Sequence, residues 1–433
     1  METNLTLISK ITAENKKKRL INLMYLLNVP TLTECFYMLK RDKAPGIDNI
    51  TFKEYEKNLN ENINNLVYRM KRWSYRPYPV KRIYIPKSDG KLRSIGIPTI
   101  EDKIVQMAIK RILQALYEQD FLNCSFGFRP GRSPHKALFA LDTMIRKNPV
   151  NYIIDADISS FFDTVNHKIL IQALNIRIGD KDLIRLIVRF LKSGIMEEGV
   201  FNSAEDGTPQ GAILSPILAN VYLHYALDTW LRNFKKRNLK GYVGMIRYCD
   251  DFVICSQGRK ETEIILEELK KRLSLFKLTL SEQKTRIIRF GRFGESTAKR
   301  NNKRPDTFDF LGFTHYLTES RNGYFKVGRK TEKKRFAKCV KNINNYLKKY
   351  RNTLKIKDIW DMLTLKIRGH YLYYGIGGNS SSIQRFYQIV RKLIFKWLNR
   401  RSQKKSFSWN SFQIYINAYP LPLPKIYHPY AVI

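Results

Sequence analysis

Apolar and polar positions follow two different periods in the first part of this chain. Residues 1–75 are rich in charged and helix-favouring side chains, and Gly46 marks a turn among them. From Val80 the pattern changes to two short apolar runs, VKRIYIP and LRSIGIP, which flank Asp89 and Gly90. Apolar runs on either side of an Asp-Gly pair are typical of a β-hairpin. The chain is therefore predicted to begin with helices and to continue into a hairpin.

Helical spacing returns after the hairpin and then gives way to strands. Apolar side chains recur every three or four positions over residues 101–118 and 134–147. NYIIDADI predicts a buried strand that ends in acids, and LSPILANVYLHYALDTWL after Gly211 predicts one helix with an apolar stripe. MIRYCDDFVIC predicts two strands around a tight turn. Helices placed irregularly between strands favour an α+β fold over a doubly wound sheet.

The last part of the sequence is helical in pattern and strongly basic. Residues 321–351 contain 12 Lys or Arg and one acid, Glu332. The apolar positions in this stretch keep helical spacing; they are Phe336, Val340, Ile343, Leu347 and Tyr350. Two more helices are predicted over 355–374 and 382–400, because a GIGGN break separates them. Residues 325–433 are expected to form a separate helical domain.

Length and charge narrow the function classes. A chain of 433 residues is long enough for two or three hydrophobic cores. Its 78 Lys and Arg against 38 Asp and Glu give a formal charge of +40, which favours nucleic acid over a membrane surface as partner. The chain has no apolar run of roughly 20 residues and no secretory signal at its start, so a cytoplasmic protein is expected. The five scattered cysteines include no CxxC pair and indicate neither disulfides nor a zinc site.

Acidic side chains at the ends of predicted strands are the candidates for chemistry. Asp250 and Asp251 adjoin at a predicted turn, and crowded carboxylates repel unless a cation or a proton compensates them. Nucleotidyl transfer needs two divalent ions about 3.5 to 4 Å apart, and Mg²⁺ prefers oxygen ligands. A third ligand is expected from IIDADISSFFD, where alternation leaves Asp155 and Asp157 open and Asp163 lies further on. Taken alone, an Asp pair is more often a solvated turn than a metal site.

Seven ordered blocks from Lys87 to Gly312 resemble those of bacterial group II intron reverse transcriptases and maturases. The blocks are PKSDGKLRSIGIPTIEDKIVQ, SFGFRPGRSPHKAL, DADISSFFDTVNH, GTPQGAILSPILANVYL, RYCDDFVI, LTLSEQKTRI and FDFLGF. PQGAILSPILAN in register between DISSFFD and YCDD is the most specific of these signals. The resemblance implies an α+β right-hand polymerase, with fingers and a palm built on antiparallel sheet, followed by an α-helical thumb and maturase region. It implies three domains: an N-terminal helical extension at 1–75, fingers and palm at 76–315, and an RNA-binding thumb and maturase region at 325–433.

The resemblance also implies roles for the residues at matching positions. It makes Asp157, Asp250 and Asp251 the catalytic ligands of two Mg²⁺ ions, for which Mn²⁺ can substitute, and it leaves Asp155 without a role. Phe162 would abut C2′ of the incoming sugar and exclude ribonucleotides, with a plain core aromatic as the alternative. The other expected contacts of the deoxynucleoside triphosphate are Lys87, Arg93, Gln210, Gly211 and Lys284. For the two lysines in this set, an ordinary surface or palm lysine is the alternative.

The basic helix of residues 333–351 lies in sequence where a thumb follows the palm. Its charged face is expected to bind nucleic-acid phosphates through Lys333, Lys334, Arg335, Lys338 and Lys341. A solvated helix face is the alternative. Further on, KIRGHYLYYGIGGN resembles the maturase signature, although His370 stands where a tryptophan is expected. The catalytic tetrapeptide departs from the family as well, because Cys249 replaces the usual alanine and raises the hypothesis of sensitivity to thiol reagents.

Three biological readings follow from the resemblance. The first is an intron-encoded reverse transcriptase that extends a DNA primer on an RNA template and binds its structured intron RNA as a maturase. The second is a group II-like host enzyme in phage defence, CRISPR spacer acquisition or DNA repair, acting with another noncoding RNA. The third is a non-catalytic RNA-splicing chaperone, against which the intact carboxylates argue. The sequence ends in PLPLPKIYHPYAVI without a nuclease pattern, so cleavage of target DNA is not expected.

Overall fold

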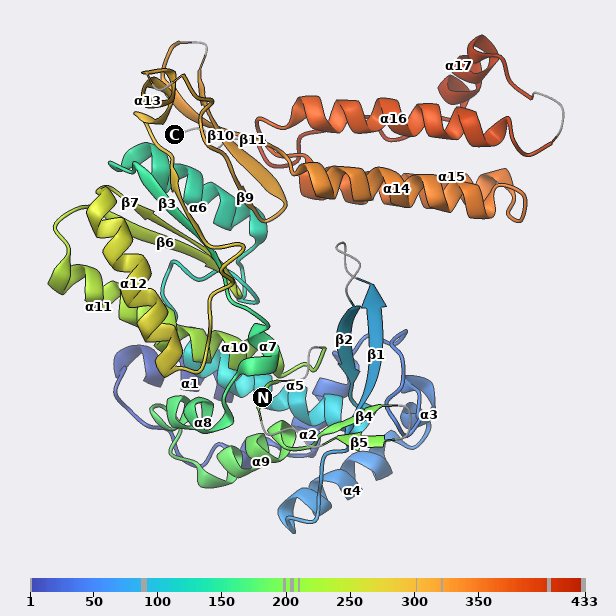
Figure 1. Cartoon of the computed structure of the whole chain (residues 1–433). Coiled ribbons are helices and arrows are strands. Elements are labelled where there is room, and N and C mark those ends of the chain that lie inside the picture. Colours follow the sequence, from blue (N-terminus) through green and yellow to red (C-terminus); the bar gives the residue numbers. More distant parts are fainter. Residues whose placement is uncertain are drawn as a thin grey trace. The chain divides into compact units, whose positions relative to one another are not determined.

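The computed structural model of the chain describes residues 2–86, 92–197, 200–202, 206–208, 211–300, 302–320, 322–402 and 406–429 (Figure 1). These residues form two compact units. Unit 1 comprises Met1–Ser133, Ala156–Phe252 and Lys260–Arg286, and unit 2 comprises Pro134–Asp155, Val253–Arg259 and Ile287–Ile433. The division into an extension, fingers and palm, and a thumb stays a prediction.

The N-terminal region of unit 1 is helical, as predicted. It contains α1 (Glu2–Glu14), α2 (Val29–Tyr37), α3 (Phe52–Lys57) and α4 (Leu59–Lys71). Helices α1 and α2 pack on α5 (Ile100–Tyr117), whose burial explains its apolar spacing. Local sequence sets these boundaries: Thr51 and Glu54 form a reciprocal capping box at the start of α3.

The predicted hairpin is present as β1 (Val80–Pro86) and β2 (Leu92–Ile97), which pair antiparallel with Ile85 opposite Arg93. Its Asp-Gly connection lies outside the described residues. The hairpin belongs to a sheet of order β2-β1-β4-β5, with β4 (Ile195–Glu197) and β5 (Val200–Asn202) beside β1.

The strands that carry the candidate carboxylates share one sheet. Its order is β6-β7-β3-β8, formed by β6 (Val243–Tyr248), β7 (Asp251–Ser256), β3 (Tyr152–Asp157) and β8 (Arg286–Arg289). Strands β6 and β7 flank a two-residue turn, as MIRYCDDFVIC predicted. The mixture of this sheet with helices confirms the α+β class.

The long helix predicted after Gly211 is interrupted. Helix α10 (Ser215–Leu223) passes through a π-helical segment (His224–Asp228) into α11 (Thr229–Asn238). The backbone N–H of Thr229 donates to the His224 carbonyl five residues earlier, as in a π-helical turn, and the Thr229 hydroxyl donates to the same carbonyl at 3.0 Å. The apolar pattern could not reveal this interruption, because almost every residue of α10 and of the π-helical segment is buried and no single face of the helix stands out.

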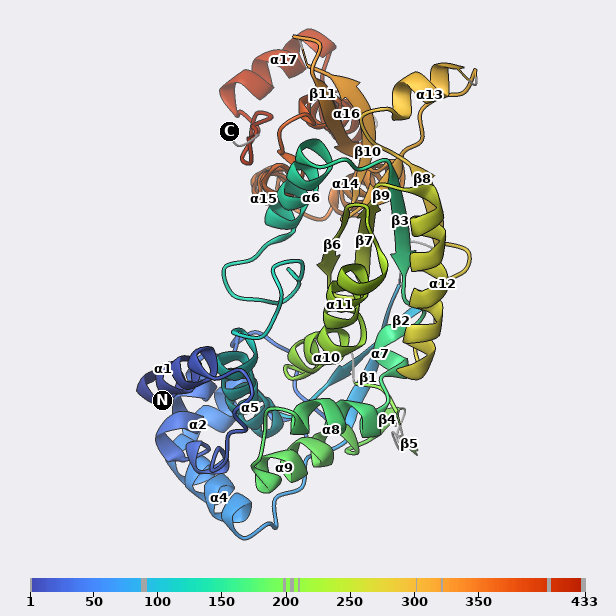
Figure 2. The ribbon, with the colours of Figure 1, turned by 90° about the vertical axis from the view of Figure 1, so that its left-hand side faces the viewer.

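Three further helices of unit 1 follow β3: α7 (Phe161–Thr164), α8 (His167–Asn175) and α9 (Lys181–Leu191), which Figure 2 shows in green. The Asp180 side chain caps α9 by accepting from the backbone N–H groups of Asp182 and Leu183. Helix α12 (Arg259–Leu275) follows β7.

Unit 2 contains the predicted helices of the basic region, α14 (Lys333–Tyr350), α15 (Ile356–Tyr374) and α16 (Ser380–Leu398), and Figure 1 shows α14 and α16 side by side. Its other elements are α6 (Pro134–Lys147), α13 (Gly294–Arg300), β9 (Phe308–Phe310), β10 (Phe313–Glu319), β11 (Phe325–Thr331) and α17 (Trp409–Ala418). None of the helices described, in either unit, is long and apolar enough to cross a membrane.

One stretch of the region expected to be helical is a strand instead. Residues 325–331 form β11, which pairs antiparallel with β10 along its whole length. Val327, Arg329 and Thr331 are buried on this strand, so its side chains follow a period of two. The density of Lys and Arg in the stretch concealed that period in the sequence.

Candidate active site

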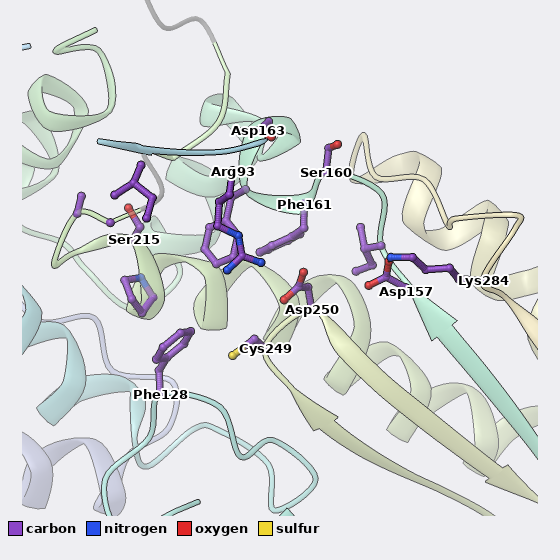
Figure 3. Close-up of a pocket in the computed structure, with 16 residues that line it drawn as sticks. Arg93, Phe128, Asp157, Ser160, Phe161, Asp163, Ser215, Cys249, Asp250 and Lys284 are labelled. Carbon is purple, nitrogen blue, oxygen red and sulfur yellow. The ribbon is translucent and has the colours of Figure 1, made fainter. Parts of the chain in front are cut away.

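A cavity of about 660 Å³ in unit 1 brings together most of the candidate site residues (Figure 3). Of the residues singled out from the sequence, Arg93, Asp157, Phe162, Gly211, Asp250 and Lys284 line it. Asp155 does not line it, whereas Asp163 does. Lys87 and Gln210 lie outside the described residues.

Asp157 is paired with Lys284 inside this cavity. The Lys284 Nζ donates to Asp157 Oδ2 at 2.5 Å, and their side chains are 68% and 28% exposed. The backbone sets up this contact, because the Ser281 N–H donates to the Asp157 carbonyl at 2.8 Å and starts the turn that carries Lys284. The hydrogen bond to Asp157 raises the pKa of Lys284, and the negative charges of Asp251 and Asp250 add to that effect.

Asp250 and Asp251 lie at the turn between β6 and β7. Burial raises the pKa of Asp250 above its ordinary value and Asp157 raises it further, whereas Arg93 and Lys284 lower it. Asp250 lines the cavity, and Asp251 begins β7 without being one of the lining residues. These side chains offer the carboxylate oxygens that a divalent cation prefers.

The carboxylates are not gathered into a closed metal site. Among the residues that the structure describes, no three His, Cys, Asp or Glu side chains are grouped closely enough to hold a metal ion together. The ammonium of Lys284 supplies a positive charge to Asp157 instead. This pairing shows that the position of Asp157 accommodates a cation.

The cavity walls next to the carboxylates are aromatic and glycine residues. Phe161 and Phe162 both line the cavity; Phe161 is buried and packs against Tyr222, and Phe162 is half-buried. Gly211 has φ of +106°, and a Cβ there would lie 2.6 Å from Ile95 Cγ2. Only glycine therefore allows this loop to approach β2 so closely.

Comparison with known proteins identifies the family. Residues 85–315, more than half of the chain, match the family described as reverse transcriptase (RNA-dependent DNA polymerase). The chain belongs to this family. It is accordingly an RNA-directed DNA polymerase of α+β class that binds an RNA template, and reverse transcriptases of this family use divalent metal ions.

The relatives of this reverse transcriptase include proteins of introns. Protein YkfC of Escherichia coli is 32% identical over 66% of this chain and 79% of its own length. The group II intron-encoded protein LtrA of Lactococcus lactis is 31% identical over 66% of this chain, and the match spans 50% of LtrA. The mitochondrial nuclear intron maturase 2 of Arabidopsis thaliana is 33% identical over 29% of this chain and 17% of its own length. The resemblance to group II intron reverse transcriptases and maturases is thereby confirmed.

Next to the turn between β6 and β7 lies a fully buried arginine, Arg247, which the sequence analysis missed. The Arg247 guanidinium donates to both carboxylate oxygens of Asp228, at 2.7 and 2.6 Å. It also donates to Asn220 Oδ1 at 3.1 Å, to the Cys249 carbonyl at 3.0 Å and to Ser125 Oγ at 2.8 Å. All five N–H donors of an arginine thus have partners. A charged residue inside the apolar run MIRYC was the available signal.

The carbonyl that Arg247 holds belongs to a strained residue. Cys249 has φ of 63°, in the left-handed region that costs a non-glycine residue free energy. Gly127 lies against it, since a Cβ on Gly127 would be 2.4 Å from Cys249 Sγ and 2.5 Å from its backbone nitrogen. Burial raises the pKa of Cys249 to about 12, which disfavours the thiolate that thiol reagents attack.

The five basic residues predicted to bind nucleic acid are all exposed on α14; they are Lys333, Lys334, Arg335, Lys338 and Lys341. Only one of them has an acidic neighbour within ion-pair distance in the described chain, since Arg335 Nε lies 3.7 Å from Glu332 Oε2. The opposite face of α14 packs on α16 through buried Ile343 and Leu347. The helix therefore presents its charges to solvent.

Proposed function

We propose that this reverse transcriptase polymerises DNA through Asp157, Asp250 and Asp251, which would hold two Mg²⁺ ions. When bound, these ions would activate the primer 3′-hydroxyl and support the leaving pyrophosphate. The observation that carries the proposal is the shared cavity, into which Asp157 comes from the end of β3 and Asp250 from the β6–β7 turn. The contact between the Lys284 ammonium and Asp157 supports the proposal as well, because a carboxylate that attracts one cation in this cavity can attract another.

The cavity walls would orient the nucleotide. Arg93 on the exposed face of β2 would bind the triphosphate, for which a guanidinium is suited by its paired donors. Lys284 would exchange its contact with Asp157 for the pyrophosphate and donate a proton to it. Phe162 would limit the space at C2′ of the sugar, and Gly211 would allow the chain to approach the substrate closely.

The natural partner that we propose is a structured group II intron RNA, with a DNA primer at the cavity and the basic face of α14 on phosphates. The similarity to an intron-encoded protein and an intron maturase supports this assignment. A host role in defence, spacer acquisition or repair is the second candidate, supported by the same polymerase chemistry with a different RNA. We also propose that the enzyme acts in the cytoplasm.

Asp250→Asn tests the catalytic assignment. The purified variant should lose extension of a DNA primer on an RNA template in Mg²⁺, because an amide is a weaker ligand than a carboxylate. Asp42→Asn makes the same chemical change at an exposed residue outside the cavity and should keep wild-type activity. Undiminished extension by Asp250→Asn would disprove the assignment of this site.

A further inference from the structure

A cluster of arginines lies in unit 1 at the junction of α4 and α9, which Figure 2 shows near one another. The segment after α4 carries Arg72, Trp73 and Arg76, and α9 carries Arg185 and Arg189 one turn apart. None of these residues lines the candidate active site. The cluster is therefore separate from the polymerase cavity.

The indole of Trp73 organises this cluster. The guanidinium carbons of Arg185 and Arg189 lie 4.5 and 4.8 Å from the centre of the Trp73 ring. Arg189 also donates to the backbone carbonyl of Tyr75 at 2.8 Å and to that of Trp73 at 3.2 Å. Trp73 itself has φ of 59°, so these contacts hold it in a left-handed conformation. The arrangement fixes two cations over one ring.

Three arginines of this cluster have no acidic partner in the part of the chain that the structure describes. Among the described residues, no carboxylate lies within ion-pair distance of Arg76, Arg185 or Arg189. Elsewhere in the unit, arginines pair with acids, as Arg69 does with Glu101 at 2.6 Å. Burial lowers the pKa of Arg189, and the positive charges of Arg76 and Arg185 lower it further.

The Trp73 ring and two backbone carbonyls offset part of the repulsion among these cations, and an anion would offset more of it. Like charges in proximity are unfavourable unless an anion compensates them. The two backbone hydrogen bonds explain the position of Arg189, but Arg76 has no polar partner within the described chain and Arg185 has only the ring. Arg185 and Arg189 share the Trp73 ring, and the charge of Arg76 is close enough to act on Arg189, so an anionic strand that contacts this surface would meet all three positive charges.

We propose that Arg76, Arg185 and Arg189 form a binding surface for the phosphate backbone of a nucleic acid, outside the polymerase cavity and the α14 face. Guanidinium groups bind phosphate through paired donors. Trp73 is already covered by arginines, so it leaves little ring surface for stacking on a base. The surface therefore reads charge and spacing rather than sequence, and it gives the bound strand a second point of attachment.

The double variant Arg76→Gln/Arg185→Gln tests this surface, because it removes two exposed charges and keeps the hydrogen bonds of Arg189. The probe is a labelled single-stranded RNA of about 30 nucleotides, and the Kd is measured by fluorescence anisotropy over a range of KCl. The slope of log Kd against log salt should fall by about 1.4, since each phosphate contact on a single strand contributes roughly 0.7. The affinity at fixed salt should fall several-fold.

The matched control is Lys236→Gln/Arg237→Gln, which removes the same charge from the exposed end of α11 in the same unit. It should leave the slope close to that of the wild type. An unchanged slope in Arg76→Gln/Arg185→Gln, or an equal fall in the control, would overturn the proposal. A thermal unfolding curve for each variant separates loss of binding from loss of folding.

Two further experiments test whether the arginines contact phosphate groups. Arg76→Lys/Arg185→Lys keeps both charges and should keep most of the salt slope; a loss as large as that of the glutamine variant would overturn a phosphate contact. The same measurement with a DNA strand of the same sequence distinguishes RNA from DNA as the ligand. If the glutamine variant loses affinity equally for both strands, the surface binds the phosphates of either nucleic acid; if it loses affinity for RNA alone, the surface is specific for RNA. Binding requires no polymerisation, so failure here leaves the catalytic proposal intact.

Discussion

Gly127 occupies a position where a single methyl group would reach the catalytic turn. A Cβ there would meet both the sulfur and the backbone nitrogen of Cys249, at 2.4 and 2.5 Å. The Gly127 carbonyl also accepts a hydrogen bond from Asn220 Nδ2 at 2.7 Å, and this bond opposes a shift of the Gly127 backbone away from Cys249. Cys249, the residue before the proposed metal ligands Asp250 and Asp251, is therefore held by packing as well as by hydrogen bonds.

We expect Gly127→Ala to lower the kcat of primer extension by about tenfold or more, because a small displacement of Asp250 disturbs the reacting geometry. The Gly127→Ala/Cys249→Ala double variant should not recover, since the backbone nitrogen of residue 249 still blocks the methyl group. Cys249→Ala alone should remain active. Recovery in the double variant would show that only the sulfur is in the way.

Phe162 lines the cavity, and its substitution tests whether it excludes ribonucleotides. Phe162→Val should relax the preference for deoxyribonucleotides over ribonucleotides by at least about tenfold, because a smaller side chain leaves room for a 2′-hydroxyl. Phe128→Val is the matched control, since Phe128 lines the same cavity from a different loop. Selectivity is measured as the ratio of kcat/KM for the two sugars, and an equal change in both variants would contradict a sugar gate at Phe162.

At the scale of elements, Arg247 connects the turn between β6 and β7 to three other segments, one of which is α10 through Asn220. It joins β6 to the π-helical segment through Asp228 and to the loop before α6 through Ser125. The π-helical segment ends at Asp228. The predicted helix is therefore interrupted at the residue whose carboxylate accepts hydrogen bonds from Arg247. Buried charges are tolerated when paired and fully hydrogen-bonded, as both are here.

Arg247→Lys should lower the free energy of unfolding by at least about 2 kcal/mol, because lysine keeps the charge but cannot satisfy this set of acceptors. It should also reduce kcat by about ten- to a hundredfold with a smaller change in KM, since the Cys249 carbonyl loses its donor. Arg82→Lys, at the more exposed pair with Glu197, is the control and should cost less than about 1 kcal/mol. Urea unfolding and steady-state primer extension measure the two effects; a fall in stability without a fall in kcat would limit Arg247 to a structural role.

At the scale of the whole molecule, several buried histidines couple folding to pH. Burial lowers the pKa of His224 and His370 from 6.5 to about 4 and that of His315 to about 3. These side chains are neutral in the folded protein, whereas the unfolded chain binds protons below about pH 6.5. The stability that these neutral histidines contribute is therefore present in full above about pH 6.5. It is lost as the pH falls, down to about 4 for His224 and His370 and about 3 for His315.

His370→Phe isolates one of these contributions. The His370 ring stacks on Phe386 at 3.7 Å, and its Nε2 is buried without a partner, so phenylalanine keeps the stack and removes the titrating group. At neutral pH the variant should be at least as stable as the wild type. At pH 4 the variant should retain about 3 kcal/mol of unfolding free energy that the wild type loses, because the lowered pKa of His370 makes protonation favour the unfolded chain. Denaturant unfolding from pH 7 to pH 4 measures the difference, and parallel curves for the two proteins would contradict the prediction.

The sequence by itself determined the elements whose apolar period is regular. The hairpin, the strands on either side of Asp250, and the helices α5, α6 and α14 to α16 all have such a period, and the structure contains them. The residues alone left Asp155 and Asp157 open, and the choice of Asp157 with Asp250 and Asp251 followed from the family resemblance, so these three stay a prediction. Periodicity and short motifs depend only on neighbours along the chain, so they can be read without a fold.

Only the tertiary structure decided which distant side chains meet. The pairing of Asp157 with Lys284, the enclosure of Arg247 and the arginines around Trp73 each join residues far apart in sequence. The strand at 325–331 and the π-helical segment also depend on partners elsewhere, on β10 and on Arg247. Hydrogen bonds and charge pairs depend on distances of a few ångströms, which only the folded chain defines. The sequence therefore proposed the candidate carboxylates, and the fold decided which side chains surround them.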